Sequence, residues 1–428
     1  GNITCYKYDE LNRMNEIWKF TSDPQPTDCS ICGSDCLKTT YAYDINNNVT
    51  SVADANLNIT SYSYDDLSRM ISFASPDSAP WTFAYDEAGN EISRTDARSI
   101  TSNKAYDSLN RITSQTFPSE PALNITYVYD SPSSTYSQGQ LSSVADSSGQ
   151  IVYNYNSRGL PASEQKTIMG SAFTNSYQYD LNGNISHIIY PSGRDIEYIH
   201  DDADRVIQVK GTYNAVTTIY ADTITYVPYG KETSVRFGNN LMLSKTYDGF
   251  SDGSKRYRLA SQSVSMSVPA IMNYSYAYDD EFYVTAITDN VNPSLSKSFT
   301  YNPLGWLQVA NGPWGQQIFD YDNNGNRITD NLNSQMTQYS YYAASNKIDY
   351  VTGSYNLTFL YDNNGNALGD GVSAFVYNAN NRLRLWNGAP GFGTYMTYDY
   401  LERRVIRNTH GVTDTYLFFF YDKDNKLI

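Results

Sequence analysis

The sequence repeats the dipeptide Tyr-Asp at a regular interval, and this repetition limits the possible folds more than any other feature. Early in the chain the pair starts every 21 residues, at Tyr43, Tyr64, Tyr85 and Tyr106. Further copies start at Tyr8, Tyr129, Tyr179, Tyr247, Tyr278, Tyr321, Tyr361, Tyr398 and Tyr421. Repetition at such a short period is typical of an array in which each unit packs on the next. We therefore predict one continuous repeat array over residues 1–428 rather than several globular domains.

Each copy of the pattern has the residue order that is typical of a β-hairpin. In the stretch "TTYAYDINNNVTSVAD", Tyr41 and Tyr43 lie two positions apart, so on an extended strand their side chains share one face. Asp44 and the asparagines after it favour a turn, and a β-branched run resumes at Val49. Glycine tolerates a positive φ and fills the turn in other copies, at Gly89, Gly183, Gly325 and Gly365.

The repeated hairpins predict an all-β protein. The units lack helical periodicity, and Gly, Pro, Asn and Asp recur too often for long helices. A single hairpin is only marginally stable in water, so neighbouring hairpins must pair into one long antiparallel sheet, which right-handed twist makes coil. Tyrosine accounts for 41 of 428 residues and is expected to pack this sheet in ladders. The repeat-core positions that we assign are Tyr43, Tyr64, Tyr85, Tyr129, Tyr179, Tyr278, Tyr321, Tyr361 and Tyr398.

Charge and hydropathy exclude two classes of partner. The formal net charge is -15 and no run of Lys and Arg occurs, so we expect no binding to nucleic acid. No stretch approaches the roughly 18 consecutive apolar residues of a membrane helix. The chain begins ("GNITCYKYDE") and ends ("YDKDNKLI") in the middle of the pattern, which suggests a processed or excised segment without its original targeting signal.

The tandem units resemble a known repeat. The stretches "YSYDDLSRMIS", "FAYDEAGNEIS" and "AYDSLNRITS" are similar to the YD or Rhs repeat, and the similarity runs through essentially the whole chain. The segment "MTYDYLERRVIRNTHGVTDTYLFFFYDKDNKLI" resembles the stretch that precedes the terminal core of bacterial Rhs proteins. The resemblance implies a hollow shell or barrel. In bacterial toxin complexes and Rhs polymorphic toxins such repeats form a spiralling cocoon around a C-terminal toxin domain, and teneurins use a similar shell for cell adhesion.

The resemblance also implies a function. We expect a non-catalytic shell segment, without a cofactor or metal, that encloses or presents a toxin or cargo domain encoded outside these residues. The alternative is an extracellular adhesion or fibre-forming protein that self-associates or binds a cell-surface glycan or receptor. Either role implies a secreted or cell-surface protein, of bacterial origin. The family's Asp-Pro-x-Gly-Leu type self-cleavage motif does not occur in this sequence, so no catalytic residue is carried over.

All four cysteines lie in the first 36 residues, at Cys5, Cys29, Cys32 and Cys36. The interval from Tyr8 to the next Tyr-Asp pair is longer than in the regular units, which places the cluster in an insertion at about residues 21–38. The four thiols are candidates for two structural disulfides, for a zinc or iron–sulfur site, or for reduced cysteines. Only one Cys-x-x-Cys pair is present, whereas paired structural zinc sites usually have two.

Other residues with catalytic or ligand chemistry fit the repeat better than a site. His200 occupies the position of the second tyrosine in its unit, His187 lies in a strand-like run, and His410 lies in an expected turn. The sequence "DNNGN" at Asp322 and Asp362 lacks the ligand spacing of a calcium loop and is expected to be a hairpin turn.

Overall fold

The computed structural model describes residues 3–22, 29–249, 256–266, 270–389, 392–410, 414–421 and 423–427. Within these ranges the chain forms β-strands and turns. Its helical content is limited to two three-residue 3-10 segments, η1 (Pro121–Leu123) and η2 (Pro293–Leu295). Neither is long or apolar enough to cross a membrane. The prediction of an all-β protein is confirmed.

The strands are short and follow one another closely. The first part of the chain forms β1 (Thr4–Tyr8), β2 (Met14–Phe20), β3 (Cys36–Tyr43), β4 (Val49–Ala53), β5 (Ile59–Tyr64), β6 (Met70–Ser75), β7 (Ser78–Tyr85), β8 (Glu91–Thr95), β9 (Thr101–Tyr106), β10 (Ile112–Thr116), β11 (Ile125–Tyr129), β12 (Leu141–Asp146) and β13 (Gly149–Tyr155). The middle part forms β14 (Pro161–Ile168), β15 (Ser171–Tyr179), β16 (Ile185–Ile189), β17 (Asp195–His200), β18 (Val206–Tyr213), β19 (Val216–Tyr226), β20 (Glu232–Phe237), β21 (Met242–Tyr247), β22 (Leu259–Ser265), β23 (Met272–Tyr278), β24 (Val284–Asp289) and β25 (Lys297–Tyr301). The last part forms β26 (Leu307–Gly312), β27 (Gly315–Tyr321), β28 (Arg327–Leu332), β29 (Gln335–Tyr341), β30 (Ile348–Thr352), β31 (Leu357–Thr358), β32 (Leu360–Tyr361), β33 (Ala367–Gly369), β34 (Ala374–Tyr377), β35 (Leu383–Ala389), β36 (Phe392–Tyr398), β37 (Arg404–His410) and β38 (Thr415–Phe418).

The strands form a meander in which each, apart from β31 and β32, pairs antiparallel with the next along the chain. This pairing gives a 31-stranded sheet from β1 to β31 and a 7-stranded sheet from β32 to β38. The two sheets are separated only at Phe359, whose N–H still donates to the carbonyl of Asp349 at 2.8 Å. The predicted long antiparallel sheet of tandem hairpins is therefore confirmed.

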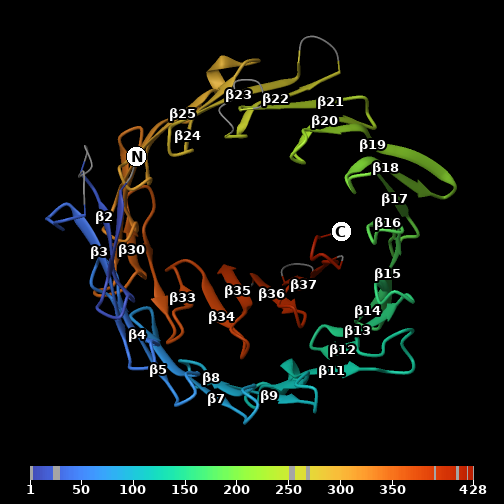
Figure 1. The fold of residues 1–428 in the computed structure, drawn as a ribbon, viewed down its shortest axis with the longest axis horizontal. Helices are drawn as coiled ribbons and strands as arrows, with labels where there is room; N and C mark the ends of the chain where they lie inside the picture. Colours follow the sequence, from blue (N-terminus) through green and yellow to red (C-terminus); the bar gives the residue numbers. More distant parts are fainter. Residues whose placement is uncertain are drawn as a thin grey trace.

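A β-bulge recurs where the return strand leaves each Tyr-Asp turn. The register shifts at the tyrosine that ends the outgoing strand, as in the pairs Tyr43–Val49, Tyr64–Met70 and Tyr85–Glu91. Bulges increase the local right-handed twist, so a bulge in each unit adds to the coiling of the sheet. The ribbon bends round into a ring, and the strands near the C-terminus run alongside strands β4 to β12 (Figure 1).

The antiparallel meander places its loops alternately on two rims. The loops on the first rim include the Tyr-Asp turns, and we call it the aspartate rim; its clearest segments are residues 9–13, 44–48, 65–69, 86–90, 107–111, 180–184, 201–205, 279–283, 322–326, 362–366 and 399–403. The loops on the opposite rim include residues 54–58, 75–78, 96–100, 117–124, 146–149, 168–171, 190–194, 213–216, 237–241, 312–315 and 332–335. Each hairpin thus contributes to one rim, and its connection to the next hairpin contributes to the other.

The sheet is a single layer that exposes much of both faces. The solvent-accessible surface is 23635 Å², whereas a compact protein of 48.2 kDa exposes about 16,500 Å². One small cluster of buried residues lies at the N-terminal end, where Cys5, Trp18 and Phe20 pack together. This excess of surface is expected for a wall and not for a globular domain.

Candidate functional site

The aspartate turn is the local unit from which the candidate site is built. Oδ1 of Asp44 accepts hydrogen bonds from the N–H groups of Asn46 and Asn48, both at 2.9 Å, and Oδ2 accepts one from the Asn48 side chain. The fourth residue of the turn, Asn47, has a φ of 68°. A left-handed residue is therefore required there, which explains why Gly or Asn occupies this position in so many copies.

Arginine at the end of a turn links it to the next turn on the rim. Arg69 donates from Nε to Oδ2 of Asp65 at 2.7 Å and from Nη1 to the carbonyl of Asp86 at 2.8 Å. Its guanidinium also lies 4.9 Å from the centre of the Tyr85 ring. The same stacking on the tyrosine of a following unit is made by Arg13, Arg111, Arg205, Arg258 and Arg403. In these six units the tyrosine therefore stacks on an arginine of an earlier turn rather than on another tyrosine.

These hydrogen bonds favour the ionised carboxylates. The side-chain hydrogen bonds from Arg205 lower the pKa of Asp201 to about 2. The backbone N–H of Arg69 lowers the pKa of Asp65, and the Asn48 side chain lowers that of Asp44. The perturbed carboxylates of the rim are explained by turn structure, because each accepts hydrogen bonds from its own turn.

The repeat-core tyrosines are half-buried, and several fasten one hairpin to the one before it. The Tyr85 hydroxyl donates to the carbonyl of Met70, the first residue of the preceding return strand, at 2.7 Å. The equivalent bond is made by Tyr43, Tyr179, Tyr278, Tyr321 and Tyr398. The structure gives Tyr129 an arginine contact and Tyr361 a ring contact with Tyr342. Burial raises the pKa of Tyr64, as it does for most of this set.

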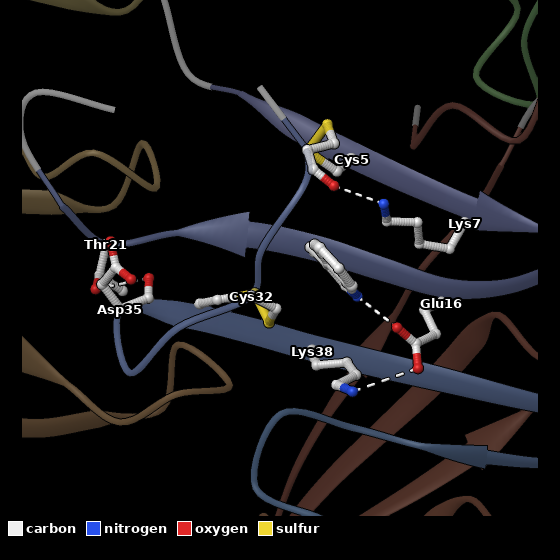
Figure 2. The surroundings of a disulfide bond; sticks show 10 residues. Cys5, Lys7, Glu16, Thr21, Cys32, Asp35 and Lys38 are labelled. Carbon is white, nitrogen blue, oxygen red and sulfur yellow. Dashed lines mark hydrogen bonds and ion pairs between the residues drawn. A yellow bond between two sulfur atoms is a disulfide. The ribbon is translucent and has the colours of Figure 1, made fainter. Parts of the chain in front are cut away.

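The structure pairs the four cysteines as Cys5–Cys29 and Cys32–Cys36 (Figure 2). Cys5 is only 1% exposed and packs on Trp18 in the N-terminal cluster. These bonds use all four sulfur atoms. The structure therefore has the two disulfides, and not the sulfur-ligated metal or the reduced thiols that the sequence left open. Part of the expected insertion, residues 23–28, lies outside the described residues. The insertion also ends earlier than expected, because Cys36 is already the first residue of β3.

The histidines and the "DNNGN" segments lie in ordinary repeat positions. His200 ends β17 and its Nδ1 lies 3.8 Å from Asp180, while His187 contacts Asp195 at 3.0 Å. His410 is the last residue of β37, so the expected turn can begin only after it. Asp322 and Asp362 each start a turn and accept hydrogen bonds from the N–H groups two and four residues later. Across the described ranges, no three His, Cys, Asp or Glu side chains gather as a metal site.

A seam forms where the chain overlaps itself after one circuit. We call residues 54–177 the first coil and residues 322–427 the overlapping coil. The opposite rim of the first coil meets the aspartate rim of the overlapping coil, through contacts between residues 233 to 280 positions apart. The resemblance implied a spiral of this kind, but its residues were not identified from the sequence.

The most buried part of the seam is a polar cluster around Asp399. The Asp399 side chain is fully buried and accepts hydrogen bonds from Lys166 at 3.1 Å and from Arg403 at 2.7 Å. Next to it, the hydroxyls of Tyr153 and Tyr400 lie 2.8 Å apart. Burial lowers the pKa of Lys166, an effect that Asp399 opposes, and burial strongly raises the pKa of Tyr153. Asp399 and Tyr400 belong to the C-terminal stretch that resembles bacterial Rhs proteins, just before its "RRV" sequence. This part of the stretch therefore contacts the first coil.

The seam and the rim also contain hollows. One of about 540 Å³ lies between Pro76 of the first coil and Tyr342 and Lys347 of the overlapping coil. A wider one of about 640 Å³ lies beside the long loop that replaces a short turn at residues 130–139. Arg111 and Asp130 line this second hollow and form an ion pair at 2.7 Å.

The chain matches one protein-family model and several solved structures. The family model of the teneurin YD-shell matches residues 4–227 and again residues 224–427. No curated protein matches the sequence. Among solved structures, the complex TcdB2-TccC3 matches with a TM-score of 0.84 at 15% identity, and TcdB2-TccC3-Cdc42 with 0.84 at 14%. The Tc holotoxin pore of Photorhabdus luminescens matches with 0.83 at 14%. Each match covers 99% of this chain, which spans about a quarter (24–25%) of the matched chains.

Proposed function

Because the chain belongs to the teneurin YD-shell family, we propose that it is a segment of a shell wall that encloses a toxin or other cargo polypeptide encoded outside residues 1–428. The observation that carries this proposal is the self-overlapping ring: a single-layer sheet whose rims meet in a polar seam. A wall of this kind separates two aqueous spaces without a large core of its own. The structural match to TcdB2-TccC3 and to the Tc holotoxin covers 99% of this chain, and it supports a toxin polypeptide as the cargo.

The proposed role is non-catalytic. The carboxylates of the rim with lowered pKa values are held by their own turns, and the buried Lys166–Asp399–Arg403 cluster is occupied by contacts between coils. The proposal also places the protein outside the cytosol, either secreted or on the cell surface. Disulfides persist in oxidising compartments, and the two disulfides here support export from the cytosol.

Protease protection tests enclosure. The natural polypeptide that contains residues 1–428 is purified and treated with a protease under native conditions, alongside a Tyr400→Ala variant that removes the Tyr153–Tyr400 contact of the seam. We expect any cargo region to survive digestion in the parent and to be degraded in the variant. Equal degradation in both proteins, with the repeat array itself intact, would exclude enclosure.

One observation favours the alternative, an extracellular adhesion protein or fibre. The free part of the aspartate rim exposes a row of apolar side chains at its turn tips: Leu11 69%, Ile45 96%, Leu67 71%, Leu109 70% and Leu181 97%. Exposed apolar rows often mark protein contacts. This alternative predicts concentration-dependent association in sedimentation velocity that Leu67→Ser and Leu109→Ser together abolish. A particle that stays monomeric at all concentrations would remove support for a self-associating fibre.

A further inference from the structure

Five acidic residues follow one another along the opposite rim of the first coil, and each faces the overlapping coil. In every case the carboxylate accepts a hydrogen bond from that coil. We call Asp54, Asp77, Asp96, Glu120 and Asp146 the acid row.

The first member of the row makes a reciprocal pair with its partner turn. Asn324 donates from its side chain to Oδ2 of Asp54 at 2.6 Å, and Asn56 donates from its side chain to Oδ2 of Asp322 at 2.9 Å. Each turn thus offers a carboxylate at its first position and an amide at its third. Two aspartate turns can face one another without repulsion because each carboxylate meets the other's amide.

The same arrangement recurs two repeats further on with one substitution. Asn364 donates to Oδ2 of Asp96 at 2.7 Å, while Arg98 takes the place of the first-coil asparagine. Nε of Arg98 lies 3.9 Å from Asp362, and its Nη1 donates to the carbonyl of Asn378 at 3.1 Å. The Arg98 side chain is 12% exposed and that of Asp96 only 6%, so this pair is well shielded from water.

Each of the remaining members accepts a hydrogen bond from a backbone N–H of the overlapping coil. Asp77 accepts from the N–H of Asn346 at 2.8 Å and from the Ser345 hydroxyl at 2.6 Å. Glu120 accepts from the N–H of Ala379 at 2.9 Å. Asp146 accepts from the N–H of Tyr400 at 2.8 Å. Among the described residues, every hydrogen bond given to the Asp77 and Glu120 carboxylates comes from the overlapping coil.

The acid row stops at Asp146, although the overlap continues to Tyr177 and its last loop on this rim, residues 168–171, contains no acidic residue. On the same rim, the loops at residues 190–194, 213–216, 237–241, 312–315 and 332–335 contain no acidic residue. Three acids do occur later on this rim: Asp289 and Asp370 accept hydrogen bonds from N–H groups of their own loops, and Asp414 contacts His410. Own-loop bonds of this kind are also made to Asp54, Asp96 and Asp146, which accept bonds from the other coil in addition. Among the described residues, the acids of this rim that accept hydrogen bonds from the other coil are thus the five between residues 54 and 146.

We propose that the acid row sets the register in which one coil of the wall seats on the next. Successive aspartate turns are so alike that a coil could slip by one unit, as repetitive strands slip when their pattern does not specify pairing. In the observed register every acid meets a donor. A slip that left Asp77 and Glu120 without donors, or that set acids of the row opposite the carboxylates of Asp322 and Asp362, would be disfavoured because unpaired and like charges oppose close contact. This proposal deepens the proposed function, because a seam in fixed register seals the wall.

The test uses an engineered crosslink across the seam. The N–H of Ala79 donates to the carbonyl of Asn363 at 2.9 Å, so Ala79→Cys with Asn363→Cys places two thiols on adjoining backbones of the two coils. The acid-row variant adds Asp77→Ala and Glu120→Ala to this parent. Its control adds Asp66→Ala and Glu87→Ala, which remove the same charges from exposed positions on the free part of the aspartate rim.

We expect the acid-row variant to lose more than half of the crosslink, measured by peptide mapping without reduction, and the control to keep it. Hydrogen exchange at the N–H groups of Asn346 and Ala379 should accelerate at least tenfold in the acid-row variant only. Circular dichroism is measured on both to establish that the sheet is intact. A crosslink that forms equally in both variants would overturn the proposal. A protein that crosslinks normally but leaves its cargo open to protease would instead contradict enclosure and leave the register proposal standing.

Discussion

At the scale of the residue, the repeated tyrosine has two roles. Its ring fills the half-buried face of the sheet, and its hydroxyl binds a backbone carbonyl of the preceding hairpin. The spacing of two between aromatic residues was sufficient to predict the shared face. The hydroxyl bond could not be predicted, because it depends on the bulge that offsets each return strand. The Asp-x-x-Gly/Asn turn was predictable because its chemistry is local.

Two substitutions at Tyr85 separate these roles. Tyr85→Phe removes only the bond to Met70 and should cost about 1 kcal/mol of unfolding free energy. Tyr85→Ala should cost about 2–3 kcal/mol, less than the ~3–5 kcal/mol of a fully buried aromatic, because Tyr85 is half-buried. Denaturant unfolding measures both. Equal costs for Phe and Ala would mean that the ring contributes nothing.

Two glycines in equivalent turns provide a matched pair. Gly89 and Gly365 have φ values of 87° and 83°, so alanine at either position should cost about 1–2 kcal/mol through backbone strain. A Cβ at Gly89 would meet open space, whereas a Cβ at Gly365 would lie 2.5 Å from the carbonyl of Asp77 in the other coil. Gly365→Ala should therefore also weaken the seam crosslink. If both variants unfold alike and form the crosslink alike, the two coils do not approach each other closely at Gly365.

Two half-buried tyrosines predict a loss of stability at alkaline pH. Burial raises the pKa of Tyr127 and Tyr179 to about 12, above their value of about 10 in an unfolded chain. Their contribution is complete below pH 10 and is lost as the pH rises from 10 through 12. Thermal unfolding between pH 8 and 12, followed with tyrosinate absorbance, measures this. A melting temperature that does not change up to pH 12 would contradict the assigned burial.

At the scale of the element, the hairpins and their order followed from the sequence. The insertion and its cysteines were also visible as a break in the period, and two disulfides were one of three alternatives left open. Their pairing was not derivable, because residues 5 and 29 are joined by tertiary packing on Trp18. In a repeat array each unit contacts mainly its neighbours, so the effects of local changes should remain local.

The disulfide Cys5–Cys29 tests that locality. It closes a loop of 24 residues and should stabilise its end of the array by about 3 kcal/mol. The double variant Cys5→Ser with Cys29→Ser should accelerate hydrogen exchange in β1 to β3 and leave β13 to β15 unchanged. The shorter loop of Cys32–Cys36 makes its double serine variant a control with a smaller effect. Equal acceleration along the whole sheet would show that the array unfolds as one cooperative block.

At the scale of the whole molecule, local rules no longer suffice. The number of residues in one circuit depends on twist accumulated over many strands and bulges, so the contacts between the two coils could not be read from one unit. The acid row was nevertheless present in the sequence, as one acid in each opposite-rim loop between residues 54 and 146. It became meaningful only when the structure placed the overlapping coil against it.

The central claim is that the array winds into a ring and seats on itself in a fixed register. Single-particle cryo-electron microscopy of the purified protein tests this most directly. The account predicts a ring whose wall is one sheet thick. Along the arc where residues 54–177 and 322–427 overlap, two coils joined rim to rim should be present instead of one. A filled globular particle, or an open ribbon without the second coil along this arc, would contradict it.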